Sequence, residues 1–229
     1  MPYFYFDTYY LFLVIPAVLI ALLAQINVSA TFKKYNAVRS SKGYTADEIA
    51  RKILDDNGLY NVRIERVSGS LSDHYDPRSN VVRLSDSTYG SSSVGAIGVA
   101  AHEVGHAVQH STGYFPIKIR QAVIPVTQIG SSLAIPLAIL GIVMSWSLLT
   151  TVGILLFCAV VLFQLITLPV EFNASRRAVK TLEAQRILEG GELAGAKKVL
   201  RAAALTYVAA LLVAVANLIR LIALSNRRR

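Results

Sequence analysis

A run of fifty residues without a charged side chain, from 121 to 170, constrains the fold of this chain most. Fifty such residues are enough for two membrane-spanning helices of about 20 residues each. We place these helices at Gln121–Val143 and Ser147–Val170, joined by a short turn at residues 144–146. A mean hydropathy of +0.49 and a hydrophobic content of 54% also favour a membrane protein over an ordinary soluble domain.

Two further apolar segments lie near the ends of the chain. The first runs from Thr8 to Ala24 or beyond, and the other from Ala202 to Ile219. The first could be a cleaved signal peptide, but no positive charge precedes it and it is longer than a typical signal core, so we expect a retained anchor. The expected segments are a membrane anchor at 8–30, a catalytic lobe at 31–120, a membrane hairpin at 121–170, a helix and connector at 171–201, a fourth membrane helix at 202–224 and a basic tail at 225–229.

The charge distribution predicts the orientation of the polar segments. Of the 23 lysines and arginines, 19 lie in residues 31–120 and 171–201, so the positive-inside rule puts both segments on the cytoplasmic side. The tail Arg227–Arg229 would then lie outside if the last apolar segment crosses fully, and this point stays open. Both segments are mixed in sign without exposed aromatics among the basic residues, so we expect no nucleic-acid partner despite the net charge of +9. The single cysteine, Cys158, excludes an intrachain disulfide.

The sequence His102-Glu103-Val104-Gly105-His106 is the feature with the clearest chemistry. On an α-helix, two histidines four residues apart lie on the same face and can bind one metal ion. Two imidazoles with a carboxylate beside them are typical of zinc peptidases, in which the carboxylate is the general base. We therefore expect one Zn²⁺ per chain, bound by His102 and His106, with Glu103 as the base. The alternative is a core helix whose histidines only bond to neighbouring residues.

The residues around this motif predict a buried helix. Ser91–Ser93 offers N-caps, and Val94–Gln109 contains no proline and no charge outside the motif. Three glycines, Gly95, Gly98 and Gly105, lie on or beside the face that carries the histidines. Because glycine disfavours a helix, their presence suggests that another helix packs closely there.

Residues 31–120 are expected to form a compact α+β lobe. A capping box at Thr45–Glu48 opens a helix that runs through Leu54. Strands are predicted at Val62–Val67 and Val81–Leu84, with a turn at Asp76–Asn80 between them. The edge of this strand pair could bind an extended peptide by main-chain hydrogen bonds.

Catalytic zinc needs a third protein ligand, and the chain has only four histidines. His110 lies eight residues after His102, about 12 Å along a helix, which is too far for both to bind one ion. We expect His110 to be solvated or interfacial. His74 could be a transition-state donor, a substrate contact, a ligand or an ordinary loop residue.

Glu171 is the best candidate for the third ligand, because it is the first charged residue after the fifty uncharged ones. It follows Pro169, where we expect the membrane helix to give way to a new one. Ala174, Ser175 and Ala178 share the face of Glu171, so this helix can approach the glycines of the motif helix. Ser175 is placed to hydrogen-bond a ligand. The alternative is a carboxylate that only marks the membrane boundary.

Four sequence blocks carry a resemblance to a known family. They are Asp73-His74-Tyr75-Asp76-Pro77 with Val82-Arg83-Leu84-Ser85, Ala101 to Gln109, Pro169 to Ser175, and Ala203 to Ala209. With these blocks the chain resembles the YugP-type family of membrane zinc metallopeptidases, which implies an integral-membrane, zinc-dependent peptidase of prokaryotic type. It is more distantly similar to the gluzincins, whose pattern implies His102, His106 and Glu171 as ligands and Glu103 as base. Many gluzincins have an aspartate at the position of Ser175, which weakens the expected support of the ligand histidine.

The combined expectation is a membrane-anchored zinc endopeptidase. Its fold should be mainly α, with about four transmembrane helices and a small α+β zincin-like catalytic lobe at the membrane surface. His74, Tyr75 or Arg176 would help the metal to stabilise the oxyanion. Peptides, or the loops and tails of membrane proteins, are the expected substrates, and the lipid bilayer is the other partner. The protein would lie in the prokaryotic cell membrane with its lobe on the cytoplasmic side, and its oligomeric state stays open.

Three other functions are alternatives to this expectation. An intramembrane-cleaving metalloprotease would need an aspartate ligand on a later apolar helix, and the chain has none there. A non-catalytic membrane scaffold with structural zinc would favour four ligands, often cysteines. A zinc or peptide transporter would place more ionisable residues inside the apolar segments.

Overall fold

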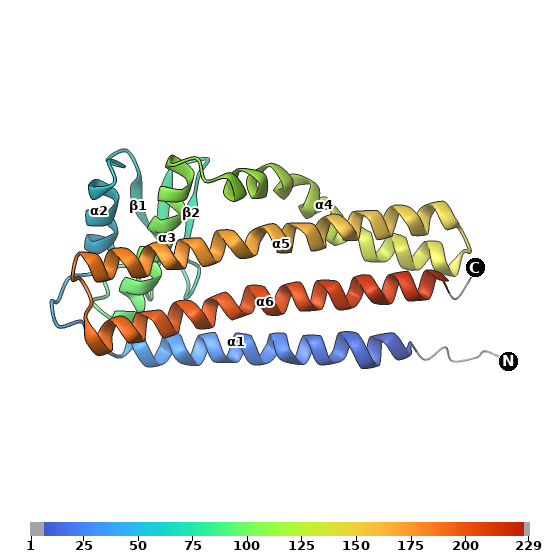
Figure 1. Ribbon diagram of the computed structural model, residues 1–229, viewed down its shortest axis with the longest axis horizontal. Helices are drawn as coiled ribbons and strands as arrows, with labels where there is room; N and C mark the ends of the chain where they lie inside the picture. Colours follow the sequence, from blue (N-terminus) through green and yellow to red (C-terminus); the bar gives the residue numbers. More distant parts are fainter. Residues whose placement is uncertain (1–6, 227–229) are drawn as a thin grey trace. The chain divides into compact units, whose positions relative to one another are not determined.

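The computed structural model describes residues 7–226, and the tail Arg227–Arg229 lies outside the described residues. The chain is mainly helical with one small sheet (Figure 1). The elements in order are η1 (Tyr10–Val14), α1 (Ile15–Asn36), α2 (Ala46–Asp56), β1 (Arg63–Val67), β2 (His74–Asp76), β3 (Val81–Ser85), α3 (Val94–Ser111), α4 (Phe115–Val143), α5 (Ser147–Ala184) and α6 (Gly190–Asn226). The expectation of a mainly α fold with a small α+β part is confirmed.

The chain divides into two compact units. One, here the helical unit, consists of the described residues of Met1–Gln25, Ile119–Leu168 and Thr206–Arg229. The other, here the lobe, consists of Ile26–Lys118 and Pro169–Leu205. Several long helices contribute residues to both units, so the unit boundaries fall inside helices and not in linkers.

The helical unit contains the apolar segments that the sequence analysis assigned to the membrane. Among the described residues, three helices are long and apolar enough to cross a bilayer, namely Tyr10–Asn36, Ser147–Ala184 and Gly190–Asn226. A fourth candidate is the bent pair Phe115–Gln128 and Gly130–Val143 in α4, whose arms meet at 46°. Three to four candidate spans therefore agree with the expected number by length and composition.

Close helix packing stabilises the helical unit where α4 and α5 meet. A Cβ atom added to Gly153 would lie 2.7 Å from the Cα of Ala138, and one added to Gly141 would lie 2.6 Å from Oγ1 of Thr150. Both separations are too short for any side chain, so glycine lets the two backbones approach. Buried apolar residues surround this contact, including Ala134, Phe157 and Val161.

The expected change from a membrane helix to a new helix at Glu171 was wrong. The helix α5 runs without interruption from Ser147 to Ala184, with Pro169 inside it. A proline removes one backbone hydrogen bond and crowds the preceding turn, but long apolar helices tolerate it when neighbours satisfy the freed groups. Glu171 is therefore carried by the same helix that contains the apolar run.

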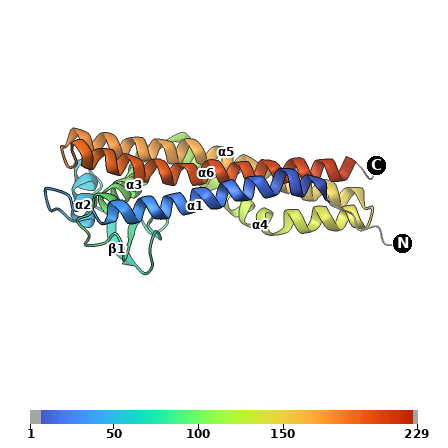
Figure 2. The same ribbon diagram turned by 90° about the horizontal axis from the view of Figure 1, so that it is seen from below.

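A mixed three-stranded sheet forms one layer of the lobe, and Figure 2 shows it near α2 and α3. Its order is β1-β3-β2, with β1 parallel and β2 antiparallel to the central strand β3. The predicted strands Val62–Val67 and Val81–Leu84 correspond to β1 and β3. The short edge strand β2 was missed, and His74 and Tyr75 lie in it, not in a loop.

The core of the lobe lies where α2, α3 and the sheet meet. The predicted capping box is present, because Thr45 accepts a hydrogen bond from the backbone of Glu48 while the Glu48 carboxylate accepts one from the backbone of Thr45. This cap starts α2, whose apolar face includes Ile49, Ile53 and Leu54.

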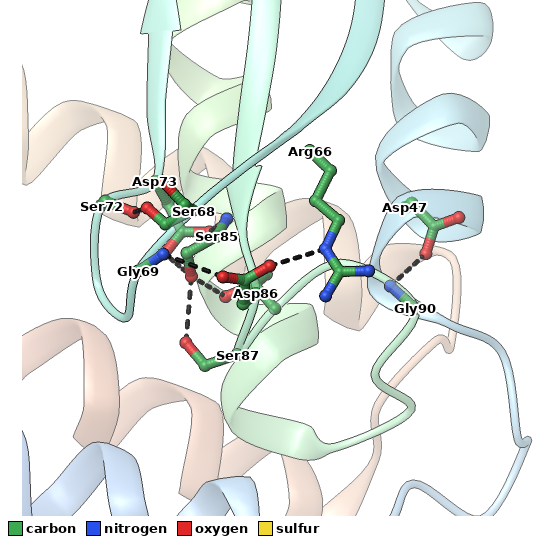
Figure 3. A network of polar contacts seen from close by, with 11 residues as sticks. Asp47, Arg66, Ser68, Gly69, Ser72, Asp73, Ser85, Asp86, Ser87 and Gly90 are labelled. Atoms are coloured by element: carbon green, nitrogen blue, oxygen red, sulfur yellow. Dashed lines mark hydrogen bonds and ion pairs between the residues drawn. The ribbon is translucent and has the colours of Figure 1, made fainter.

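A network of polar contacts fixes the loops around the sheet (Figure 3). The Asp73 carboxylate accepts hydrogen bonds from the backbone N–H of Ser85 at 2.7 Å and from its hydroxyl at 2.9 Å. The Asp86 carboxylate accepts from Arg66 at 2.7 Å and from the N–H of Gly69 at 2.9 Å. These contacts join the start of β2 to the end of β3 and hold the segment that leads into α3.

Candidate metal centre

The helix α3 carries the histidine motif through the middle of the lobe. It starts where the Ser93 side chain accepts a hydrogen bond from the backbone of Ala96 at 3.1 Å, which confirms the predicted serine cap. Fourteen of its residues are buried, including Glu103 and His106. A helix with so few exposed positions is a core element, as the uncharged sequence predicted.

Each of the three glycines in α3 meets a different helix of the lobe. A Cβ added to Gly95 would lie 3.1 Å from the backbone N of Asn36 in α1, and one added to Gly98 would lie 3.2 Å from Cβ of Ala196 in α6. At Gly105 the neighbour is the carbonyl oxygen of Ala174 in α5, at 2.9 Å. The predicted close packing is confirmed, and the contact at Gly105 brings α5 against the face that carries the histidines.

That contact places His102, His106 and Glu171 together, as the sequence analysis predicted. The Oε2 atom of Glu171 lies 3.2 Å from Nε2 of His102 and 3.5 Å from Nε2 of His106. The three potential ligand atoms all lie within 4.8 Å of one another. Glu171 is only 2% exposed and His106 9%, so the group is largely removed from solvent.

Two of the three separations in this group suit a zinc ion. Two ligands at about 2.1 Å from a tetrahedral zinc lie about 3.4 Å apart. The two separations between the carboxylate oxygen and the imidazole nitrogens, 3.2 and 3.5 Å, bracket this value. Two imidazoles and one carboxylate also form a ligand set found in catalytic zinc sites, where three protein ligands leave a position for water. These three residues could therefore hold one metal ion.

A residue of α5 hydrogen-bonds the His102 ring at the nitrogen that does not face Glu171. The Nδ1 atom of His102 lies 3.1 Å from Oγ of Ser175, one turn beyond Glu171. The predicted hydrogen bond between Ser175 and a histidine of the motif is thus confirmed. When this ring donates its Nδ1 proton to the hydroxyl, Nε2 keeps its lone pair on the side of Glu171.

His106 is supported by Gln109, a residue to which the sequence analysis gave no role. Nδ1 of His106 lies 3.0 Å from Oε1 of Gln109, which is completely buried. The amide nitrogen of Gln109 donates to the carbonyl oxygen of Val170 at 2.8 Å and to Oδ1 of Asn173 at 3.0 Å. Gln109 is three residues after His106 and shares its helical face, which was the available signal.

The pKa of His106 reflects this environment. Burial lowers the pKa, but the hydrogen bond and the charge of the Glu171 carboxylate outweigh it and raise the pKa above its ordinary value. A bare imidazole nitrogen facing a carboxylate oxygen at 3.5 Å is repulsive unless a proton or a cation lies between them. The site therefore favours a positive charge at the point where the three ligand atoms meet.

Glu103 lies next to the ligands but outside the three-residue group. It is 8% exposed. Within residues 7–226, its carboxylate takes part in no hydrogen bond or ion pair with another side chain or backbone group. A carboxylate that is buried yet uncommitted is available to bind a water molecule or a substrate proton.

Two other predicted site residues, His74 and Tyr75, lie in the edge strand β2. Tyr75 lies on the α3 side of the sheet, with its ring 6.0 Å from that of His110 and its hydroxyl donating to Oδ1 of Asn80 at 3.0 Å. Burial and the neighbouring Asp76 raise the pKa of this phenol. His110 is exposed, as predicted.

His74 alternates with Tyr75 along β2 and so projects from the other face of the sheet. It is exposed, and its Nδ1 atom lies 2.9 Å from the carbonyl oxygen of Ser72. Among the described residues it does not belong to the group that could hold a metal ion. Its role as a donor stays a prediction.

The fold contains a group of residues that could hold a metal ion, and sequence comparison supplies the family. The family model described as "Putative neutral zinc metallopeptidase" matches residues 10–226. Because this match covers nearly the whole chain, the chain belongs to that family.

A relative with high sequence identity supports this membership. The "Putative membrane protease YugP" of Bacillus subtilis (strain 168) is 49% identical over 214 residues, which cover 93% of this chain and 95% of that protein. The resemblance drawn from the sequence blocks is therefore confirmed. No solved structure matches the chain.

Proposed function

We propose that this protein is a membrane-anchored, zinc-dependent endopeptidase of the gluzincin type. The observation that carries the proposal is the meeting of His102, His106 and Glu171 at distances that suit one zinc ion. The family and the named relative support the peptidase activity and the membrane location.

His102, His106 and Glu171 would hold the metal, and Glu103 would act as the general base. A bound zinc ion supplies Lewis-acid activation of water and stabilisation of negative charge on a carbonyl oxygen. Glu103 would accept the proton of the attacking water on a carboxylate oxygen and return it to the leaving amine. Its burial beside the ligands, without a competing hydrogen bond, supports this role.

The substrate would be a peptide or an exposed loop or tail of a membrane protein. The strand β2 is at the edge of the sheet, so its free backbone groups could pair with an extended peptide. Tyr75 in this strand, with His74 or with Arg176 in α5, would contact the substrate or the developing oxyanion. The lobe would face the cytoplasm of a prokaryotic cell, because most basic residues lie in its segments.

The role of Glu103 is tested by Glu103→Gln. The amide keeps the size of the side chain but cannot accept a proton, so hydrolysis of a peptide library in detergent should fall by about a thousandfold or more. Zinc content, measured by atomic emission, should stay at one ion per chain. Glu183→Gln, an exposed glutamate of the same net charge change, is the matched control. Retained hydrolysis in Glu103→Gln would remove Glu103 from the reaction.

The ligand role of Glu171 is tested by Glu171→Ala. Loss of one of three protein ligands should reduce the bound zinc to well below one ion per chain and abolish hydrolysis. An unchanged zinc content would reject Glu171 as a ligand. Wild-type protein that binds zinc at this site but cleaves no peptide would instead support a non-catalytic scaffold.

A further inference from the structure

A chain of side-chain amides connects His106 to the surface of the lobe. It runs from Nδ1 of His106 to Gln109, from Gln109 to Asn173 at 3.0 Å, and from Asn173 to Nε of Arg177 at 2.8 Å. The first two residues belong to α3 and the last two to α5. Gln109 is completely buried, and its polar atoms all find partners in this chain or in the backbone of Val170.

The donors and acceptors in this series of hydrogen bonds can be assigned from the groups whose role is fixed, the Arg177 guanidinium and the Val170 carbonyl. A guanidinium group only donates, so the atom of Asn173 that faces Arg177 is its carbonyl oxygen. The backbone carbonyl of Val170 only accepts, so the atom of Gln109 that faces it is the NH₂ group. The two protons of that NH₂ group are then both used, one toward Val170 and one toward Oδ1 of Asn173.

This assignment leaves one possibility for the ring of His106. The oxygen of Gln109 faces Nδ1 of His106 and can only accept, so Nδ1 must carry the proton. In the neutral ring the proton is then absent from Nε2, the atom that faces Glu171. Without Gln109, the neighbouring carboxylate would favour the opposite tautomer, in which Nε2 carries the proton and donates to Glu171.

We propose that Gln109 is a positioning residue that holds His106 in its metal-binding tautomer, and that Asn173 and Arg177 hold Gln109 in the required orientation. The proposal rests on the proposed function, because it assigns these residues to the same zinc site. It differs from the support of His102, where the hydroxyl of Ser175 can either donate or accept and so selects no tautomer by itself.

The first test measures zinc affinity by competition with a chelator in the purified full-length protein. Gln109→Met keeps the volume of the side chain and should weaken zinc binding about 10- to 100-fold. Arg177→Met should weaken it less, about threefold, because Val170 still orients Gln109. Lys180→Met, an exposed change on the next turn of the same helix, should leave the affinity unchanged.

Asn173 provides a rescue pair for the same measurement. Asn173→Asp keeps an oxygen acceptor for both Arg177 and Gln109 and should retain the wild-type affinity. Asn173→Leu removes the acceptor and should match or exceed the loss in Arg177→Met. Equal behaviour of the two variants would show that the hydrogen bonds of Asn173 do not matter and would contradict the proposal.

The second test reads the tautomer itself by ¹⁵N NMR of labelled histidine in the metal-free protein at alkaline pH, where the ring is neutral. The wild type and Lys180→Met should carry the His106 proton on Nδ1. Gln109→Met should shift it toward Nε2, a change that a merely structural role of Gln109 would not produce. If Gln109→Met kept the proton on Nδ1, the proposal would be overturned. If the wild type bound no zinc, the proposed function would be overturned instead. The tautomer result would still stand, because it is measured in the metal-free protein.

Discussion

In two helix contacts of this protein, a glycine lets two backbones approach closely, but the consequences differ. In the lobe, Gly105 of α3 meets the backbone of Ala174 in α5, and the same contact carries the three candidate ligands. In the helical unit, Gly153 of α5 meets the backbone of Ala138 in α4, and the surroundings are apolar. The close approach at Gly105 thus sets the distances between the candidate ligands. The close approach at Gly153 affects only the packing of apolar side chains.

The largest effect is expected from Gly105→Val, which tests whether the lobe contact sets the ligand distances. Its Cβ would lie 2.9 Å from the carbonyl oxygen of Ala174, so α5 has to move away from α3. A displacement of about 1 Å can cost a hundredfold in rate, and we expect at least that loss of peptidase activity together with weaker zinc binding. Activity and zinc titration would measure it, and a variant with normal affinity would show that the spacing is not critical.

The matched change in the other contact is Gly153→Val. The added side chain would overlap the backbone of Ala138, and overpacking of this kind costs about 1–3 kcal/mol of stability. The protein should therefore unfold at lower temperature in detergent while the folded fraction still binds one zinc ion per chain. Loss of zinc without loss of stability would contradict the contrast between the two contacts.

A smaller effect than that of either glycine change is expected from Ser175→Ala, which removes the hydroxyl that contacts Nδ1 of His102 but leaves the helix contact intact. One hydrogen bond contributes about 1 kcal/mol, so zinc affinity should fall about fivefold. Ser175→Asp places a carboxylate next to Nδ1 of His102 and should tighten zinc binding instead. A loss in both variants would mean that the serine is required for packing and not for its hydrogen bond.

The sequence predicted the centre of the site better than its surroundings. Histidines at helical spacing and the first carboxylate after a long uncharged run have few alternative explanations, so His102, His106 and Glu171 could be chosen together. Gln109 shares the helical face of His106, but this signal is weak because neutral amides are common. The partners of Gln109 and Asn173 depend on how two distant helices pack.

The fold shows the same division between local and distant signals. Capping residues and glycines act over a few positions, so the start of α2 at Thr45 and the close packing of α3 were predictable. The strand β2 is only three residues long, and the Asp73 carboxylate just before it accepts a hydrogen bond from Ser85 at the end of β3, a contact between residues far apart in the sequence. The continuity of α5 through Pro169 depends likewise on the environment of the helix and not on local preference.

The separation of the ligands along the chain has a consequence for biosynthesis. Glu171 lies 69 residues after His102, so a nascent chain contains both imidazoles well before it contains the carboxylate. If the proposed chemistry holds, a truncated or stalled translation product that ends before α5 would have an incomplete centre. The nascent chain could then not cleave other proteins before its apolar hairpin has been synthesised.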